Sequence, residues 1–331
     1  MLPNQGWKGR LGVETRVDFG AKVTDLDGVR VKLAMARANA EQLDILLRPF
    51  VDAAQRSIER APSENPFEVI YKITKMPWID PAWSALFGQG IYNIRSALDH
   101  LAWQLVLLDG QEPTRATQFP LLVAKRDKSG RKVRVDIAPG IKRPDILTAV
   151  ESMQPYHGGG KWGDQLGVVA ELSRIDKHRL PIAVSTMLNI DNIFWGLPEG
   201  SRTPSWWFPV GKALNEGDVV ARFLFNEPVA PEVLDPCLVP QIALDEAPLG
   251  SPYRTQDLAS LLGGLARIAA FKIDTLIVAP LFEGELPAWI APGPPQPDTI
   301  PRVGANLLGT GERQSLEDNG RTAGTVDADA T

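Results

Sequence analysis

The stretch YNIRSALDHL, residues 92–101, lies inside a segment whose apolar residues recur at helical spacing. These residues form one stripe along the segment, which is the pattern of a helix that faces a core. The stripe consists of Ile91, Ile94, Leu98, Leu101, Leu105 and Leu108. Tyr92 and Trp103 are large residues outside the stripe. The segment therefore predicts a central helix over 82–108 that is covered on more than one side.

The same spacing predicts four further helices. They cover residues 31–60, a short segment that opens at Pro144, residues 164–179 and residues 255–275. Pro49 lies inside the first of these, where a missing N–H group predicts a kink or a break. Thr255 is the expected N-terminal cap of the last helix.

Two regions are β-rich. Residues 67–75 alternate between apolar and polar, which predicts a strand, and residues 180–244 contain short β-rich runs separated by Gly, Pro and Asn. Such short runs favour antiparallel pairing. We expect one residue of the pair Trp206–Trp207 in the core and the other over the sheet edge, with base stacking as the alternative. Helices that precede strands predict an α+β fold, a helical bundle packed with an antiparallel β-sheet.

These predictions divide the chain into five parts. They are an irregular N-terminal arm (1–30), a mainly helical region with one strand near 67–75 (31–179), an antiparallel β region (180–245), a C-terminal helix that packs on the core (250–285) and a disordered C-terminal tail (286–331). The tail is rich in Pro, Gly, Asp and Thr and poor in large apolar residues, a composition that cannot form a core.

Composition narrows the class of protein. The 331 residues include 44% hydrophobic and 23% charged residues, an ordinary globular mixture, and the net charge of −5 argues against a surface coated with positive charge. There is no DNA-binding signature and no apolar run of the ~20 residues that cross a bilayer, so we expect no membrane association. The single Cys237 and the absence of a secretory signal predict a cytoplasmic protein.

Arg95 and His100 are the first candidate site residues, because charge is rare in an otherwise apolar helix and the chain has only three histidines. Five residues turn a helix by about 500°, which leaves the two side chains about 140° apart around the axis. His100 shares a polar strip with Asn93 and Ser96. A site that uses both Arg95 and His100 therefore requires a second element or a second subunit across the helix.

The R-x4-H spacing of Arg95 and His100 resembles the signature of the HEPN superfamily. The resemblance implies a helical bundle that acts as a metal-independent endoribonuclease, with no cofactor, whose Arg/His pairs meet in a homodimer. His100 would then move protons between the ribose 2′-OH and the leaving 5′-oxygen, the acid–base role that imidazole commonly takes. Arg95 would stabilise charge on the phosphoryl oxygens, and Asn93 or Ser96 would orient the imidazole.

A non-catalytic binding or structural protein is the alternative. Arg95 and Asp99 then form an i,i+4 pair on one helix. Asp176 falls on the apolar side of the helix over 164–179, where a carboxylate requires a partner, and Arg95 is the expected one. His178 lies beside Asp176 at the end of that helix, where positive charge is favoured. In this interpretation the charged residues are a supporting network.

A looser resemblance covers both clusters. The segment NIRSALDHL, residues 93–101, together with the segment DKHRL, residues 176–180, is similar to a group of bacterial and phage proteins. This resemblance spans about half of the chain and implies no activity.

A basic run covers residues 125–134. Its six basic residues in ten positions could bind the phosphates of RNA, since such contacts give affinity that does not depend on sequence. They are Lys125, Arg126, Lys128, Arg131, Lys132 and Arg134. A solvated surface loop is the alternative. The run supports RNA cleavage only where it projects beside His100.

Metal binding is the third alternative. Helical bundles similar to the DinB family assemble three histidines around a metal, and the chain has His100, His157 and His178 near three helical segments. None of them has another His three or four residues away, and no H-E-x-x-H motif is present. We therefore assign no metal ligand.

Overall fold

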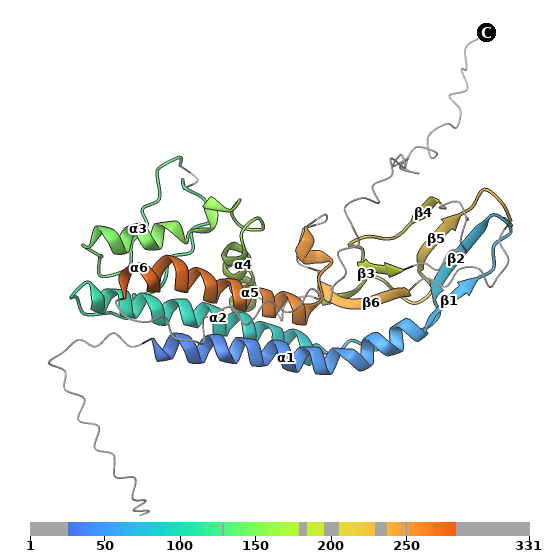
Figure 1. Ribbon diagram of the computed structural model, residues 1–331, viewed down its shortest axis with the longest axis horizontal. Coiled ribbons are helices and arrows are strands. Elements are labelled where there is room, and N and C mark those ends of the chain that lie inside the picture. Colours follow the sequence, from blue (N-terminus) through green and yellow to red (C-terminus); the bar gives the residue numbers. More distant parts are fainter. Residues whose placement is uncertain are drawn as a thin grey trace, which may run out of the picture. The chain divides into compact units, whose positions relative to one another are not determined.

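The computed structural model describes residues 26–127, 129–178, 184–194, 205–228, 237–245, 247–248 and 251–282. All of them belong to one unit, Met1–Leu286. Nearly all of the expected N-terminal arm and the whole expected tail lie outside the described residues. The described part is α+β, as the sequence predicts: a layer of long helices packs with antiparallel β-sheets (Figure 1).

Helix α1, Asp27–Arg56, is amphipathic over its whole length. One face is buried, with spacings of three and four residues: Val29, Leu33, Ala36, Ala40, Leu43, Leu47, Phe50 and Ala54. Of the kink or break predicted at Pro49, the break is wrong, because the helix continues through this residue. Pro49 and Ile45 both lie on the exposed face, so water can bind the carbonyl that the missing N–H leaves free.

Helix α2, Pro81–Leu108, is the predicted central helix. Asp80 caps it by accepting a hydrogen bond from the Ala82 N–H at 2.8 Å. It packs against α1 on one side and against α4, Gln165–His178, and α5, Leu258–Ile273, on others (Figure 1). Helix α2 is therefore covered on more than one side, as its sequence predicts.

The remaining helical elements are shorter. They are α3, Pro144–Ser152; the short η1, Pro155–His157; η2, Pro252–Arg254; the π-helical turn η3, Asp274–Val278; and α6, Ala279–Leu281. The expected cap of α5 is corrected: Asp257, not Thr255, accepts the Ser260 N–H at 2.8 Å. Among the described residues, no helix is long and apolar enough to cross a membrane.

In the described part of the chain, six strands form two antiparallel sheets instead of the single sheet expected from 180–245. The four-stranded sheet has the order β1-β2-β5-β4, and the two-stranded sheet pairs β3 with β6. The strands are β1, Ile58–Ala61; β2, Glu68–Ile73; β3, Val184–Phe194; β4, Ser205–Trp207; β5, Val219–Leu224; and β6, Cys237–Leu244. The first two form a hairpin from the mainly helical part of the chain, and β2 pairs with the much later β5.

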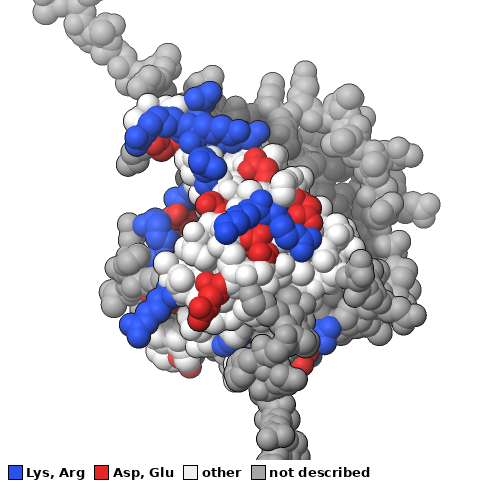
Figure 2. Space-filling view, turned by 90° about the vertical axis from the view of Figure 1, so that its left-hand side faces the viewer, with Lys and Arg blue, Asp and Glu red and all other residues white. Residues whose placement is uncertain are grey.

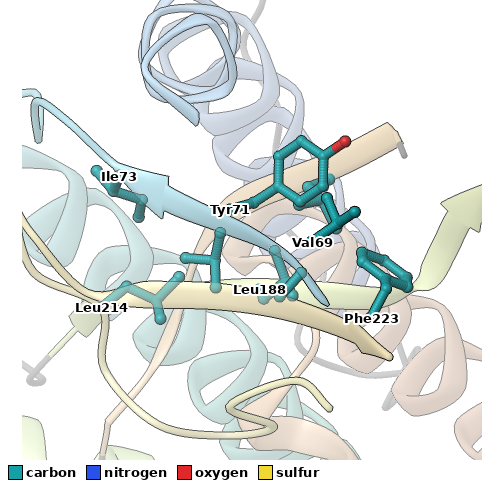
Figure 3. Packing of buried hydrophobic residues seen from close by; sticks show 9 residues of the cluster. Val69, Tyr71, Ile73, Leu188, Leu214 and Phe223 are labelled. Atoms are coloured by element: carbon teal, nitrogen blue, oxygen red, sulfur yellow. The ribbon is translucent and has the colours of Figure 1, made fainter. Parts of the chain in front are cut away.

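A shared core joins the two sheets. Val69, Tyr71 and Phe223 of the four-stranded sheet pack with Leu188 of the two-stranded sheet (Figure 3). The rings of Tyr71 and Phe223 meet edge to face, with centroids 6.1 Å apart. The expectation that one tryptophan of the pair in β4 lies in the core is wrong, since Trp206 is 52% exposed and its neighbour 36% exposed.

Candidate functional site

Arg95 joins helix α2 to the loop that follows it. Its Nη2 donates to Asp99 Oδ1 at 2.9 Å and to the Phe119 carbonyl at 2.7 Å. The Phe119 N–H donates to the same Asp99 oxygen at 3.0 Å. The Arg95 side chain is 13% exposed and that of Asp99 is 32% exposed. These three residues form a closed, half-buried network in which the i,i+4 pair of the sequence alternative is present.

Asp176 lies apart from this network. It is exposed, and its carboxylate lies against Gly88 of α2. The expected pair of Arg95 with a buried Asp176 is therefore corrected: Arg95 pairs with Asp99, on its own helix. The side chain of His178 lies outside the described residues.

His100 faces a different neighbour from Arg95. It is exposed and lies over Gly28, where a Cβ atom would collide with the imidazole. Asn93 faces the same helix, α1: it is fully buried, its Nδ2 donates to Asn39 Oδ1 at 3.1 Å, and its Oδ1 accepts from Lys32 Nζ at 3.5 Å.

Ser96 is half-buried, one turn before His100. The fold thus places Asn93 and His100 toward α1 and Arg95 toward Phe119. A single chain does not bring Arg95 and His100 together.

A polar cleft of 420 Å³ opens where Arg95 meets α4. Three parts of the chain line it: Arg95 of α2, the loop Gln118–Leu121, and Ala170, Ser173 and Arg174 of α4. Arg174 Nη2 pairs with Glu171 Oε1 at 2.6 Å, and Lys161 Nζ pairs with the same oxygen at 2.7 Å. Hydrogen bonds from Arg174 and then Lys161 hold the pKa of Glu171 below its usual range, so this carboxylate stays charged.

The basic run folds as a short hairpin, the basic hairpin, residues 125–134. The backbones of Arg126 and Lys132 form an antiparallel β-bridge, and the Val133 N–H donates to the Lys125 carbonyl at 2.9 Å. Asp127 orders the turn by accepting from the backbone N–H groups of Ser129 at 2.9 Å and Arg131 at 3.0 Å. The Ser129 hydroxyl and the Arg131 N–H lower the pKa of Asp127. Hydrogen bonds to the ionised Asp127 carboxylate therefore hold the turn in place.

The side chains of the hairpin's basic residues are exposed. They are Lys125, Arg126, Arg131, Lys132 and Arg134, while Lys128 lies outside the described residues. Figure 2 faces the left-hand end of the helices in Figure 1. Lys and Arg gather at the top of this view, where Figure 1 places the hairpin. Lys125 Nζ lies 5.3 Å from the Tyr156 ring centroid. The hairpin is thus a concentrated positive surface on a chain of net negative charge.

The base of the hairpin is fixed next to the cleft. Leu122 donates its N–H to Gln154 Oε1 at 2.9 Å, and its carbonyl accepts from the Tyr156 N–H at 3.2 Å. Leu121 lines the cleft and is four residues from Lys125, a distance of at most ~14 Å along an extended chain. The hairpin therefore lies beside the Arg95 cleft. It is not beside His100, which contacts α1 on the other side of α2 (Figure 1).

The described residues contain no group of three His, Cys, Asp or Glu side chains that could hold a metal ion. His157 is engaged elsewhere: its Nε2 lies 3.1 Å from the Glu151 carbonyl, and its ring packs on Tyr156 with centroids 4.6 Å apart. His100 is on another helix and faces α1. The DinB-like alternative gains no support from these positions.

Ser173 and Gln118 were not predicted as site residues. Ser173 occupies an ordinary position in an amphipathic helix, and Gln118 lies in a loop without a motif. Their place at the cleft depends on how α2, α4 and the loop pack, which no local pattern encodes.

Comparisons of the chain with protein-family models, curated proteins and solved structures find no match. The resemblance to the HEPN superfamily therefore stays a prediction.

Proposed function

We propose that this protein binds RNA without cleaving it, and that the basic hairpin makes the main contact. The proposal rests on the ordered structure of the hairpin. Asp127 holds its turn through backbone hydrogen bonds, and five basic side chains are exposed on it. The side chains of Lys132 and Arg134 are exposed and make no hydrogen bond or ion pair among the described residues, so their charge is available to a polyanion. Contacts of Lys and Arg with phosphates give affinity for RNA of any sequence.

The position of Arg95 supports binding over cleavage. General acid–base cleavage of RNA requires a proton-transferring group and an anion-stabilising group within about 3 Å of one reacting phosphate. His100 lies against α1, whereas Arg95 is held by Asp99 and Phe119. Within one chain these two groups do not face a common space.

The endoribonuclease is the second candidate function, and one observation favours it: His100 is exposed. Cleavage would require a homodimer in which Arg95 of one protomer approaches His100 of the other. Its test is incubation of RNA with the purified full chain in EDTA, beside His100→Ala. We expect intact RNA from both. Cleavage that gives 2′,3′-cyclic phosphate ends and is lost in His100→Ala would replace the binding proposal with the nuclease.

Fluorescence anisotropy with a short unstructured RNA tests the binding proposal. The double variant Lys132→Gln/Arg134→Gln removes two exposed charges without removing a described contact, so it should fold normally and bind RNA at least about tenfold more weakly. The control Arg37→Gln/Arg48→Gln removes the same charge from the exposed face of α1 and should bind like the wild type. Equal weakening in both variants would refute a specific role for the hairpin.

A further inference from the structure

We propose that the cleft between Arg95 and Arg174 binds a phosphate group. This inference rests on the proposed function for the identity of the molecule that carries the phosphate, which would be RNA bound at the adjacent basic hairpin.

Arg95 presents an oriented guanidinium with unused donors. Only its Nη2 is engaged, with Asp99 and Phe119, among the described residues. Nε and Nη1 are not among the buried atoms that lack a partner, so both remain accessible. A guanidinium that is fixed on one side loses little conformational freedom when the other side donates to an oxyanion. Arg95 lines the cleft and is therefore a preorganised guanidinium with two donors left for a ligand there.

Ser173 supplies a second, independent observation. The residue is only 7% exposed and lines the cleft, yet its hydroxyl has no hydrogen-bond partner among the described residues. The hydroxyl is not one of the fully buried unpartnered atoms, so it keeps some access to solvent or to a ligand. A nearly buried hydroxyl without a protein partner is costly unless water or a ligand satisfies it. Ser173 thus fits a ligand oxygen as its partner.

The charges around the cleft favour a singly charged oxyanion. Three cations (Arg95, Arg174 and Lys161) stand against two carboxylates (Asp99 and Glu171), which leaves one positive charge in excess. Each phosphodiester of RNA carries one negative charge. The donors come from two helices, α2 and α4, so a ligand with several acceptor oxygens, such as phosphate, can accept from both.

The position of the cleft fits the same ligand. Pro120, Leu121 and Ala170 give it an apolar wall, against which a sugar can pack. The loop that lines the cleft leads into the basic hairpin within four residues. One RNA strand can therefore place one phosphate in the cleft and others at the hairpin.

The test is a titration of the full-length protein with inorganic phosphate, followed by NMR through the backbone amides of Ala170 and Ser173. We expect saturable shifts in the wild type. Ser173→Ala and Arg174→Gln should each raise the phosphate Kd about tenfold, the effect of one hydrogen bond to a charged group. Arg48→Gln is the control for Arg174→Gln. Arg48 is also an exposed arginine paired with a carboxylate on its own helix, Asp44, and its replacement should leave the phosphate Kd unchanged.

RNA with and without a 5′-phosphate distinguishes the two sources of the phosphate. A backbone phosphate predicts that Ser173→Ala weakens both RNAs equally, and a terminal phosphate predicts that only the 5′-phosphorylated RNA is affected; either result supports the cleft. Absence of phosphate binding, or no effect of Ser173→Ala on phosphate and on both RNAs, overturns the phosphate site in the cleft.

The same experiments separate the cleft from the hairpin. RNA binding without a phosphate site in the cleft leaves the hairpin proposal standing, whereas phosphate binding without RNA binding refutes the hairpin proposal alone.

Discussion

Arg95 and Asp99 each bind the loop after α2 at Phe119, and we expect these contacts to contribute more to stability than the ion pair between the two side chains. A solvent-exposed i,i+4 ion pair contributes little to stability, because water screens it and both side chains lose freedom. Here the same carboxylate also accepts the N–H of Phe119, whose side chain is 1% exposed, and the same guanidinium donates to its carbonyl. The network therefore positions the loop that lines the cleft.

Asp99→Ala tests this role at the scale of single residues. We expect it to lower the free energy of unfolding by about 2 kcal/mol, because it leaves the Phe119 N–H without its partner and releases Arg95. Asp44→Ala is the matched control, since Asp44 pairs with Arg48 four residues away on an exposed surface. That variant should lose less than about 0.5 kcal/mol in urea denaturation. Equal losses would show that the network has no special structural role.

At the scale of elements, glycine sets the distance between α2 and α5. A Cβ atom at Gly90 would collide with Leu262, which is fully buried in α5. Gly264 lies in α5 with open space around the position of its missing Cβ. The two positions therefore separate close packing from helix propensity.

Gly90→Ala should destabilise the protein by about 1–3 kcal/mol, because overpacking outweighs the gain in helix propensity. Gly264→Ala should instead stabilise it by about 0.5–1 kcal/mol, since only the propensity changes. Thermal unfolding of both variants beside the wild type measures the difference. A stabilising Gly90→Ala would contradict the close packing of α2 on α5.

Asp274 predicts a pH dependence at the π-helical turn after α5. It is 9% exposed, its Oδ1 is buried without a partner among the described residues, and burial raises its pKa. A folded-state pKa above the unfolded one means that the folded protein binds more protons in between, so stability falls as the pH rises from the ordinary Asp pKa through the raised value. Asp274→Asn should remove this fall in urea denaturation across that range. An unchanged pH dependence would contradict it.

At the scale of the whole molecule, local patterns predicted the elements better than their pairing. The spacing of apolar residues located α2 and α5, and alternation located β2 within residues 67–75. The pairing of β2 with β5 joins residues about 150 positions apart, for example Val69 with Phe223, and no local pattern specifies such a partner. One β region was consequently predicted where two sheets exist.

In the candidate site, too, the sequence predicted the local features and not those that depend on packing. The i,i+4 spacing of Arg95 and Asp99 and the basic composition of residues 125–134 could be predicted from the sequence, because both are local. The carbonyl of Phe119 and the hydroxyl of Ser173 reach the cleft only through packing. Asp176 shows the converse error: its helical position predicted a buried carboxylate, but the residue is exposed near the end of α4, with its carboxylate against Gly88 of α2.

The salt dependence of RNA binding tests whether the basic hairpin binds RNA through its charges. When a protein binds single-stranded RNA, each phosphate contact contributes about −0.7 to the slope of log K against log salt concentration. We predict that the wild type binds with a clear negative slope and that Lys132→Gln/Arg134→Gln makes this slope shallower by about 1.4, with the RNA intact throughout. No binding at low salt, or an identical slope in the variant, would contradict an RNA-binding function of the basic hairpin.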